Sequence, residues 1–180
     1  MEPLKIDAYY RPGVGVDPAE VVPFPFGMEL IAGDPTHTEA SQMDESAGWI
    51  CGASPRMRTA PPDCPSTAPL HMLLTFPDCW DGRHVRSEDF RSHAAYSTDG
   101  SCPDKHPVHI PQLTMSINFG FSGPPDALRL ASGNVHSAHG DFLNAWDPEG
   151  LEREVTNCIN AEVICDLVSN RDEDGPFFTR

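Results

Sequence analysis

The sequence predicts a mainly β protein: a disulfide-stapled β-sandwich or jelly-roll-like domain with long loops and one C-terminal helix. Three observations lead to this fold class. The chain has 19 prolines and 14 glycines in 180 residues, which argues against a helical bundle because a proline inside a helix removes a backbone hydrogen bond. Several short apolar segments have the length or the alternation of strands, and six cysteines can form three bridges. At this length, a single domain over residues 1–180 is the first expectation.

Strands are expected at several places along the chain. Residues 6–10 alternate weakly before a turn, and residues 21–33 are rich in β-formers, with prolines that confine the first half to a sheet edge. Residues 70–76 form a compact apolar run that is too short for a helix. Residues 113–119 show the clearest alternation of apolar and polar side chains, and residues 128–130 are a weaker candidate.

One helix is expected near the C-terminus. Asp147 can cap it, Pro148 fits its first turn, and Leu151, Val155 and Cys158 lie on one face at spacings i, i+4 and i+7. This pattern predicts an amphipathic helix that begins after Asp147.

The remaining segments are expected to be a loop, a strand and a tail. Residues 34–68 show no periodicity and are expected to form a long loop. Residues 163–168 are expected to form a final strand, and residues 171–180 a mobile acidic tail.

The charge of the chain argues against several partners. It has 27 acidic and 12 basic side chains, hence a net charge of −15, whereas nucleic acids and anionic membrane surfaces attract clustered Lys and Arg. No apolar run reaches the ~20 residues that a membrane-spanning helix needs. The glycine-rich phosphate loops, the Gly-x-Ser-x-Gly elbow and the His-Glu-x-x-His zinc helix are also absent from the sequence. We therefore expect no nucleic-acid partner and no membrane insertion.

The six cysteines favour disulfides, since none of them forms a Cys-x-x-Cys pair. Six cysteines allow fifteen pairings, and the nearest-neighbour one is favoured because each pair brackets a turn-rich segment. It consists of Cys51–Cys64, Cys79–Cys102 and Cys158–Cys165. Such bridges predict an oxidising compartment, with buried free thiols in a cytosolic protein as the alternative. The first residues lack the pattern of a secretory signal, so we expect either a fragment without its export signal or reduced cysteines.

Candidate site residues fall into two clusters. In the first, Asp78, Asp81 and His93 are candidates for substrate contact or catalysis, and Trp80 between the two aspartates suits stacking against a sugar. Ordinary turn chemistry is the favoured explanation of both aspartates, and a buried tryptophan beside a disulfide is as ordinary as one that stacks on a sugar.

The second cluster lies towards the C-terminus. His139 and Asp141 are two residues apart, so an extended backbone points both to one face, where the carboxylate can orient a general base or both side chains can bind a divalent metal together with His136. Alternatively, Asp141 caps a turn and His139 fills a polar gap. Asn144 and Trp146 are further candidates for substrate binding.

Four motifs, in this order, resemble the family known as domain of unknown function nineteen-ninety-six. They are Phe-Pro-Asp-Cys-Trp-Asp-Gly at 76–82, Arg-Ser-His-Ala-Ala-Tyr at 91–96, Cys-Pro at 102–103 with His-Pro-Val-His-Ile-Pro-Gln-Leu at 106–113, and His-Gly-Asp-Phe-Leu-Asn-Ala-Trp-Asp at 139–147. Residues 9–11, 23–25 and 31–34 also resemble that family, so the resemblance covers nearly the whole chain.

The resemblance implies a secreted protein with extracellular disulfides, because members of this family are typically secreted bacterial or fungal proteins, in fungi sometimes joined to carbohydrate-binding modules. Members usually carry a further N-terminal portion with a Ser-His-x-His motif. The resemblance therefore also implies that residues 1–180 are the C-terminal part of a longer family domain.

We therefore expect an extracellular glycan-active or glycan-binding domain whose partner is a polysaccharide or other glycan. If the protein is an enzyme, the expected reaction is hydrolysis, with His139 as base or metal ligand, Asp141 as its orienting carboxylate and a divalent metal as the candidate cofactor. The alternatives are a non-catalytic secreted surface or adhesion module, in which the same polar residues are buried and mutually hydrogen-bonded, and a secreted metal-binding protein.

Overall fold

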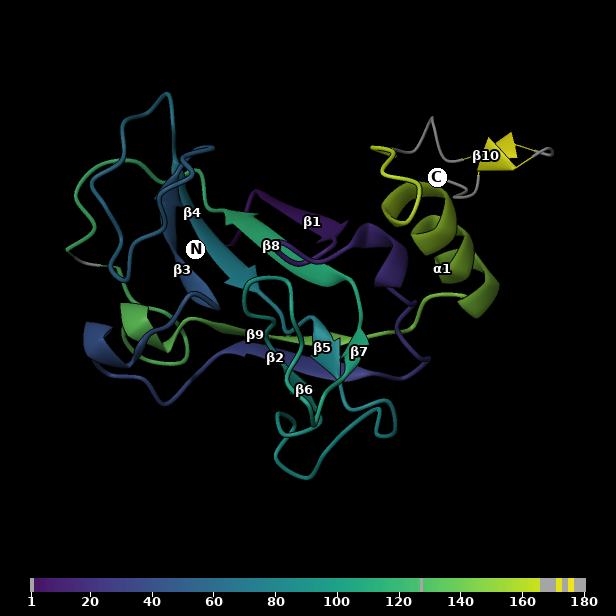
Figure 1. The fold of residues 1–180 in the computed structure, drawn as a ribbon. Helices are drawn as coiled ribbons and strands as arrows, with labels where there is room; N and C mark the ends of the chain where they lie inside the picture. The colour runs from purple at the N-terminus through teal and green to yellow at the C-terminus, as the bar shows by residue number, and fades with distance from the viewer. Residues whose placement is uncertain (1, 127, 166–170, 173–174, 177–180) are drawn as a thin grey trace. The chain divides into compact units, whose positions relative to one another are not determined.

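The computed structural model describes residues 2–126, 128–165, 171–172 and 175–176 (Figure 1). The chain forms two compact units, and each is assembled from three separate segments. Unit 1 consists of Met1–Tyr9, Ile31–Phe76 and Leu113–Asp141, and unit 2 consists of Tyr10–Leu30, Pro77–Gln112 and Phe142–Arg180. Neither unit is a continuous stretch of sequence, and the expectation of one domain over residues 1–180 stays a prediction.

The largest sheet has four strands in the order β1-β8-β4-β3 and lies mostly in unit 1. Its strands are β1 (Lys5–Arg11), β8 (Gln112–Asn118), β4 (Leu70–Thr75) and β3 (Ala47–Cys51). Strand β4 pairs antiparallel with both of its neighbours, and Figure 1 shows the three strands side by side. Buried and half-buried side chains alternate along β4, which is the pattern of a strand with one face towards the core. The strands expected at 6–10, 70–76 and 113–119 are thus confirmed.

Strand β3 corrects the expectation of a long loop over residues 34–68. That prediction was wrong at Ala47–Cys51, because the four residues from Ala47 to Ile50 are all buried and a strand covered on both faces shows no alternation. The outer edge of β3 is covered in part by Arg58, whose backbone exchanges hydrogen bonds of 2.9 and 3.0 Å with that of Trp49. A 3₁₀ turn, η2 (Ala40–Gln42), also lies in this segment.

Unit 2 contains a small antiparallel sheet in the order β6-β5-β7. Its strands are β5 (Cys79–Trp80), β6 (Ala94–Ala95) and β7 (Val108–His109). Periodicity did not predict these strands, because two residues are too few to display a period. The connection between β5 and β6 carries Asp81 and His93, whereas Trp80 lies in β5 and Asp78 directly precedes it.

Strands β2 (Glu29–Gly33) and β9 (His139–Leu143) form a two-stranded sheet. The strand expected at 21–33 therefore occupies only the second half of that segment, after the prolines. The candidate at 128–130 is reduced to an isolated bridge between Leu130 and Gly133. Two further 3₁₀ turns are η1 (Pro18–Glu20) and η3 (Val135–Ser137).

The C-terminal helix is present as predicted. Helix α1 (Pro148–Glu154) continues as a π-helical turn, η4 (Val155–Ile159), and Asp147 Oδ2 accepts a 2.8 Å hydrogen bond from the backbone N–H of Gly150. The expected apolar face of Leu151, Val155 and Cys158 is buried.

The last segments are described only in part. Residues 163–165 are not in a strand, and residues 166–168 of the expected final strand lie outside the described residues. Within the expected tail, β10 (Arg171–Asp172) pairs antiparallel with β11 (Gly175–Pro176), and the rest of 171–180 lies outside the described residues.

Three disulfides join Cys51 to Cys64, Cys79 to Cys102 and Cys158 to Cys165, which is the pairing favoured from the sequence. The structure confirms a mainly β, disulfide-stapled protein with one C-terminal helix, and the sandwich or jelly-roll arrangement stays a prediction. Across the described ranges, no helix has the length and apolar character needed to cross a membrane.

Candidate functional site

Asp78 is enclosed in unit 2 and holds a loop in place. Its side chain is 0% exposed, and its two carboxylate oxygens accept hydrogen bonds from the backbone N–H (2.8 Å) and the hydroxyl (2.6 Å) of Ser97. Gly13 makes room for this carboxylate, because a Cβ at that position would lie 1.9 Å from Asp78 Oδ2. Both oxygens are therefore committed to an internal contact, so Asp78 does not face a substrate.

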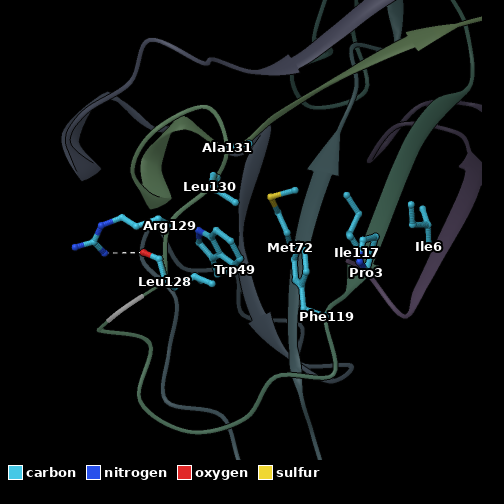
Figure 2. Close-up of a pocket in the computed structure, with 10 residues that line it drawn as sticks. All are labelled: Pro3, Ile6, Trp49, Met72, Ile117, Phe119, Leu128, Arg129, Leu130 and Ala131. Carbon is cyan, nitrogen blue, oxygen red and sulfur yellow. Dashed lines mark hydrogen bonds between the residues drawn. The ribbon is translucent and has the colours of Figure 1, made fainter. Parts of the chain in front are cut away.

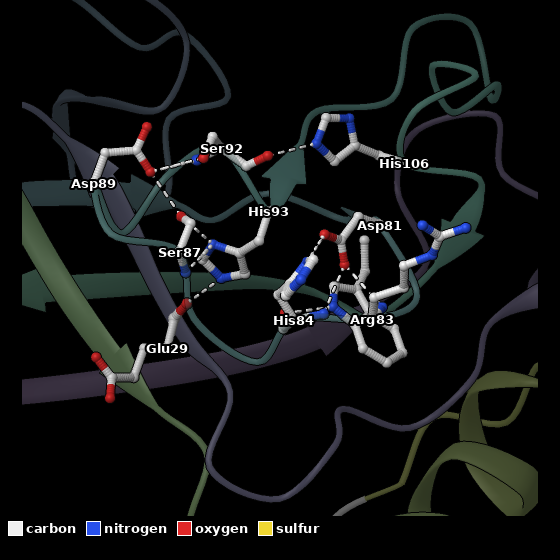
Figure 3. Close-up of polar contacts among 10 residues, drawn as sticks. Glu29, Asp81, Arg83, His84, Ser87, Asp89, Ser92, His93 and His106 are labelled. Carbon is white, nitrogen blue, oxygen red and sulfur yellow. Dashed lines mark hydrogen bonds and ion pairs between the residues drawn. The ribbon is translucent and has the colours of Figure 1, made fainter.

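His93 is equally enclosed, with 1% of its surface exposed. Its Nε2 lies 2.7 Å from the carbonyl oxygen of Glu29, so Nε2 carries a proton and donates it. Its Nδ1 lies 2.8 Å from the hydroxyl of Ser87 and 3.3 Å from the backbone nitrogen of the same residue (Figure 3). Both ring nitrogens are thus engaged within unit 2.

The hydroxyl of Ser87 extends this network to Asp89, whose Oδ1 accepts from it at 2.6 Å. The same oxygen accepts from the backbone nitrogens of Arg91 and Ser92 and from the hydroxyl of Ser92. These hydrogen bonds, that from Ser87 foremost, lower the pKa of the Asp89 carboxyl well below its usual range. Ser87 and Asp89 were not predicted as site residues. The sequence nevertheless carries a local signal, because an Asp side chain that accepts hydrogen bonds from the backbone N–H groups two and three residues later is typical of a turn.

Trp80 and Asp81 form the more accessible part of this loop. Trp80 is half-buried, and its Nε1 donates a 2.7 Å hydrogen bond to the carbonyl oxygen of His84, which fixes the orientation of the indole. Asp81 Oδ1 accepts from the backbone nitrogens of Arg83 (2.8 Å) and His84 (2.9 Å), and Oδ2 lies 2.6 Å from His84 Nδ1 (Figure 3).

These contacts determine the charge of Asp81. Partial burial raises the pKa of its carboxyl, but the hydrogen bonds from His84 and Arg83 outweigh this and hold the pKa at about 2. Asp81 is therefore a carboxylate throughout the neutral range. The side chain of His84 is 65% exposed, and this histidine was not predicted as a site residue.

The second cluster of candidates lies in unit 1. His139 Nδ1 is 2.9 Å from the carbonyl oxygen of Ser137, so Nδ1 carries a proton, and in the neutral ring the lone pair is on Nε2. His136 Nδ1 is 3.0 Å from the carbonyl oxygen of Thr59. Asp141 is exposed. The carbonyl oxygen of Ser137 thus orients His139, which is the role expected of Asp141.

One group of three potential metal ligands occurs within the described residues: atoms of Cys79, Cys102 and His109 that all lie within 4.8 Å of one another. The trio of His136, His139 and Asp141 does not form such a group there, and its metal binding stays a prediction. Asp78, Asp81 and His93 belong to the other unit.

Asn144 and Trp146 are used inside unit 2. Asn144 is 1% exposed, and its amide donates to the carbonyl oxygens of Phe24 (3.2 Å) and Pro25 (3.0 Å). The ring of Trp146 meets that of Tyr10 edge-on at 5.8 Å, and burial raises the pKa of the tyrosine. Asn144 is thus closed to a sugar, whereas the sugar contact of the half-buried Trp146 stays a prediction.

Unit 1 has a pocket of about 380 Å³ that the sequence did not reveal, because its walls come from distant segments (Figure 2). It is lined by Pro3, Ile6, Trp49, Met72, Ile117, Phe119, Leu128, Arg129, Leu130 and Ala131. Among the lining residues, only Arg129 has a charged side chain, and its guanidinium donates to the carbonyl oxygen of Leu128 at 2.6 Å. Such a wall suits an apolar group better than a sugar, which needs several polar partners.

Comparison with protein-family models finds a match. The family model described as "Domain of unknown function (DUF1996)" matches residues 2–146, which is most of the chain. The search of curated proteins finds no match, and neither does the search of solved structures.

Proposed function

The chain belongs to this family, and from that premise we propose that it is an extracellular glycan-binding module whose sugar contact is built on Trp80. The observation that carries the proposal is the hydrogen bond from Trp80 Nε1 to the carbonyl oxygen of His84, beside the ionised Asp81. It gives a half-buried indole a single orientation next to two polar side chains.

This arrangement matches the chemistry of a sugar. The C–H face of a pyranose stacks against an aromatic ring, and its hydroxyl groups hydrogen-bond to neighbouring carboxylate and imidazole groups. Because the ring and the carboxylate are already held by internal hydrogen bonds, little conformational entropy is lost when a ligand binds.

The same contacts favour binding over hydrolysis in this loop. A general acid must be protonated near the working pH, whereas the pKa of Asp81 is about 2. Asp78 and His93 are buried, and their polar atoms are taken by Ser97, Ser87 and Glu29. None of the three residues is thus placed as a proton donor to a glycosidic oxygen.

The extracellular location is part of the proposal. Three disulfides restrict the unfolded chain and suit an oxidising compartment, where they persist. Expression in an oxidising host should therefore yield the three bridges without added oxidant.

The experiment is a glycan-array and calorimetric binding screen of the oxidised chain against its variants. We expect at least one polysaccharide to bind the wild type, Trp80→Ala to weaken binding at least tenfold, and Trp80→Phe to retain part of it. Phe26→Ala is the matched control, since Phe26 is an aromatic residue of the same unit that is 66% exposed.

A second measurement guards against loss of folding in the variants. In the wild type, the bound glycan should protect Trp80 from oxidative footprinting and leave Trp49 unchanged. Binding that survives Trp80→Ala at full strength, or the absence of binding to every glycan on the array, would overturn the proposal.

A second candidate function is hydrolysis at His139, with or without a divalent metal. It is favoured by the tautomer that Ser137 imposes, because Nε2 of His139 is left as a base or ligand. His139→Ala should then abolish hydrolysis or metal retention with little change in melting temperature. A large loss of stability without an effect on either would contradict this candidate.

A further inference from the structure

The Cys79–Cys102 bridge in unit 2 has a histidine against it. Cys79 lies opposite His109 in the β5–β7 pair, so both side chains project from the same face. His109 Nδ1 lies 3.2 Å from Cys102 Sγ, and the three ligand atoms of Cys79, Cys102 and His109 are within 4.8 Å of one another. Neither of the other two bridges belongs to such a group within the described residues.

The carboxylate of Glu20 faces the other ring nitrogen of His109. Glu20 Oε2 lies 3.6 Å from His109 Nε2, at the end of η1. The backbone N–H of Val22, which follows that turn, donates a 2.9 Å hydrogen bond to the carbonyl oxygen of His109, so the turn and β7 are held together. A carboxylate that faces Nε2 favours the proton on that nitrogen and leaves the Nδ1 lone pair directed at the sulfurs.

We propose that reduction of the Cys79–Cys102 disulfide converts this group into a zinc site, with both thiolates and His109 Nδ1 as ligands and water as the fourth. Two sulfurs and one imidazole are a ligand set that Zn²⁺ prefers, at about 2.3 Å for sulfur and 2.0 Å for nitrogen. Donor atoms within 4.8 Å of one another need only side-chain rotation to reach a tetrahedron around one ion. Glu20 Oε2 lies 3.6 Å from His109 Nε2, so a small rotation of the glutamate brings it into the carboxylate–histidine–metal arrangement that orients ligands in zinc proteins.

The reductant is a dithiol. One of its thiolates attacks Cys102 Sγ, because Cys102 is half-buried whereas Cys79 is 0% exposed. The S–S bond breaks, Cys79 leaves as a thiolate, and a mixed disulfide forms on Cys102. The second thiolate of the dithiol then closes its own disulfide and releases Cys102. Two electrons pass to the bridge, and two protons of the dithiol move to the cysteines, which give them up to solvent when Zn²⁺ binds.

The test is zinc uptake by the full chain before and after reduction. The protein is reduced with excess dithiol, freed of reductant under argon, and titrated with Zn²⁺ under native mass spectrometry, with Co²⁺ absorption as a second signal of thiolate ligation. We expect one Zn²⁺ per reduced chain and none per oxidised chain. His109→Gln should weaken binding at least tenfold, and Glu20→Gln by about 10-fold or more.

The matched control is His106→Gln. His106 lies three residues before His109, and its Nε2 contacts the carbonyl oxygen of Ser92, so this variant should bind zinc as the wild type does. Equal zinc affinity in His109→Gln and the wild type would overturn the proposal, as would uptake by the oxidised protein.

Alkylation followed by peptide mass spectrometry covers the case in which reduction unfolds the chain. Zinc should protect Cys79 and Cys102 from alkylation and leave the other four cysteines reactive. Equal protection of all six cysteines, or protection of none, would also overturn the proposal.

Discussion

The Nε2 atom of His93 lies 2.7 Å from the backbone carbonyl oxygen of Glu29, 64 residues earlier in the chain. The imidazole thereby ties the first residue of β2 to the loop between β5 and β6 within unit 2. Its other nitrogen meets the hydroxyl of Ser87. The histidine that the sequence suggested for catalysis thus holds two segments together.

Replacing His93 should therefore cost stability. His93→Ala leaves a cavity and an unpaired carbonyl oxygen at Glu29, so we expect the free energy of unfolding to fall by about 2–4 kcal/mol. Urea unfolding of the oxidised protein at pH 7 measures this. The control is His84→Ala, which removes a 65% exposed side chain and should change the free energy by less than about 1 kcal/mol. Similar stabilities of the two variants would refute the bridging role.

Asp81 should make stability depend on pH in the acid range. Its pKa of about 2 in the folded protein lies below the ordinary 3.8, so its contribution is complete above pH 3.8 and is lost as the pH falls towards 2. Thermal melts of the wild type and Asp81→Asn should differ by a constant amount above pH 4, and the difference should shrink below it. A difference that persists unchanged to pH 2 would show that the charge of Asp81 is not responsible.

Glu154 should have the opposite dependence on pH. Burial raises the pKa of its carboxyl, and its Oε1 is enclosed without a hydrogen-bond partner within the described part of the chain. A raised pKa means that its favourable contribution is complete below 4.5 and is lost as the pH rises through the folded value.

Glu154→Gln should therefore raise the melting temperature at pH 7 and have little effect below pH 4.5. Glu152→Gln, an exposed position on the same helix, is the control and should leave the melting temperature unchanged at both pH values. If Glu154→Gln and Glu152→Gln have the same melting temperature at pH 7, the burial of the Glu154 carboxylate does not destabilise the folded protein.

The elements that the sequence predicted well are those with a local signal. Strand β4 and strand β8 show apolar side chains at strand spacing, and α1 has its cap and its apolar face within twelve residues. Strand β3 escaped prediction because its residues are buried on both faces, and β5, β6 and β7 escaped because two residues display no period.

The candidate site was predicted less completely. The sequence marked Asp78 and His93 as polar residues near strand ends, but their enclosure depends on Gly13, Ser97 and Glu29, which lie far from them in the chain. Trp80 and Asp81 were also marked, whereas the contact of both with His84 appeared only in three dimensions.

By itself, the sequence determined the mainly β class and the C-terminal helix and favoured one pairing of the cysteines, because period, capping and spacing are properties of neighbouring residues. Only the tertiary structure decided which polar side chains are enclosed and which remain accessible. The free energy of a carboxylate or an imidazole depends on its hydrogen-bond partners and on its exclusion from water, and here distant segments supply both.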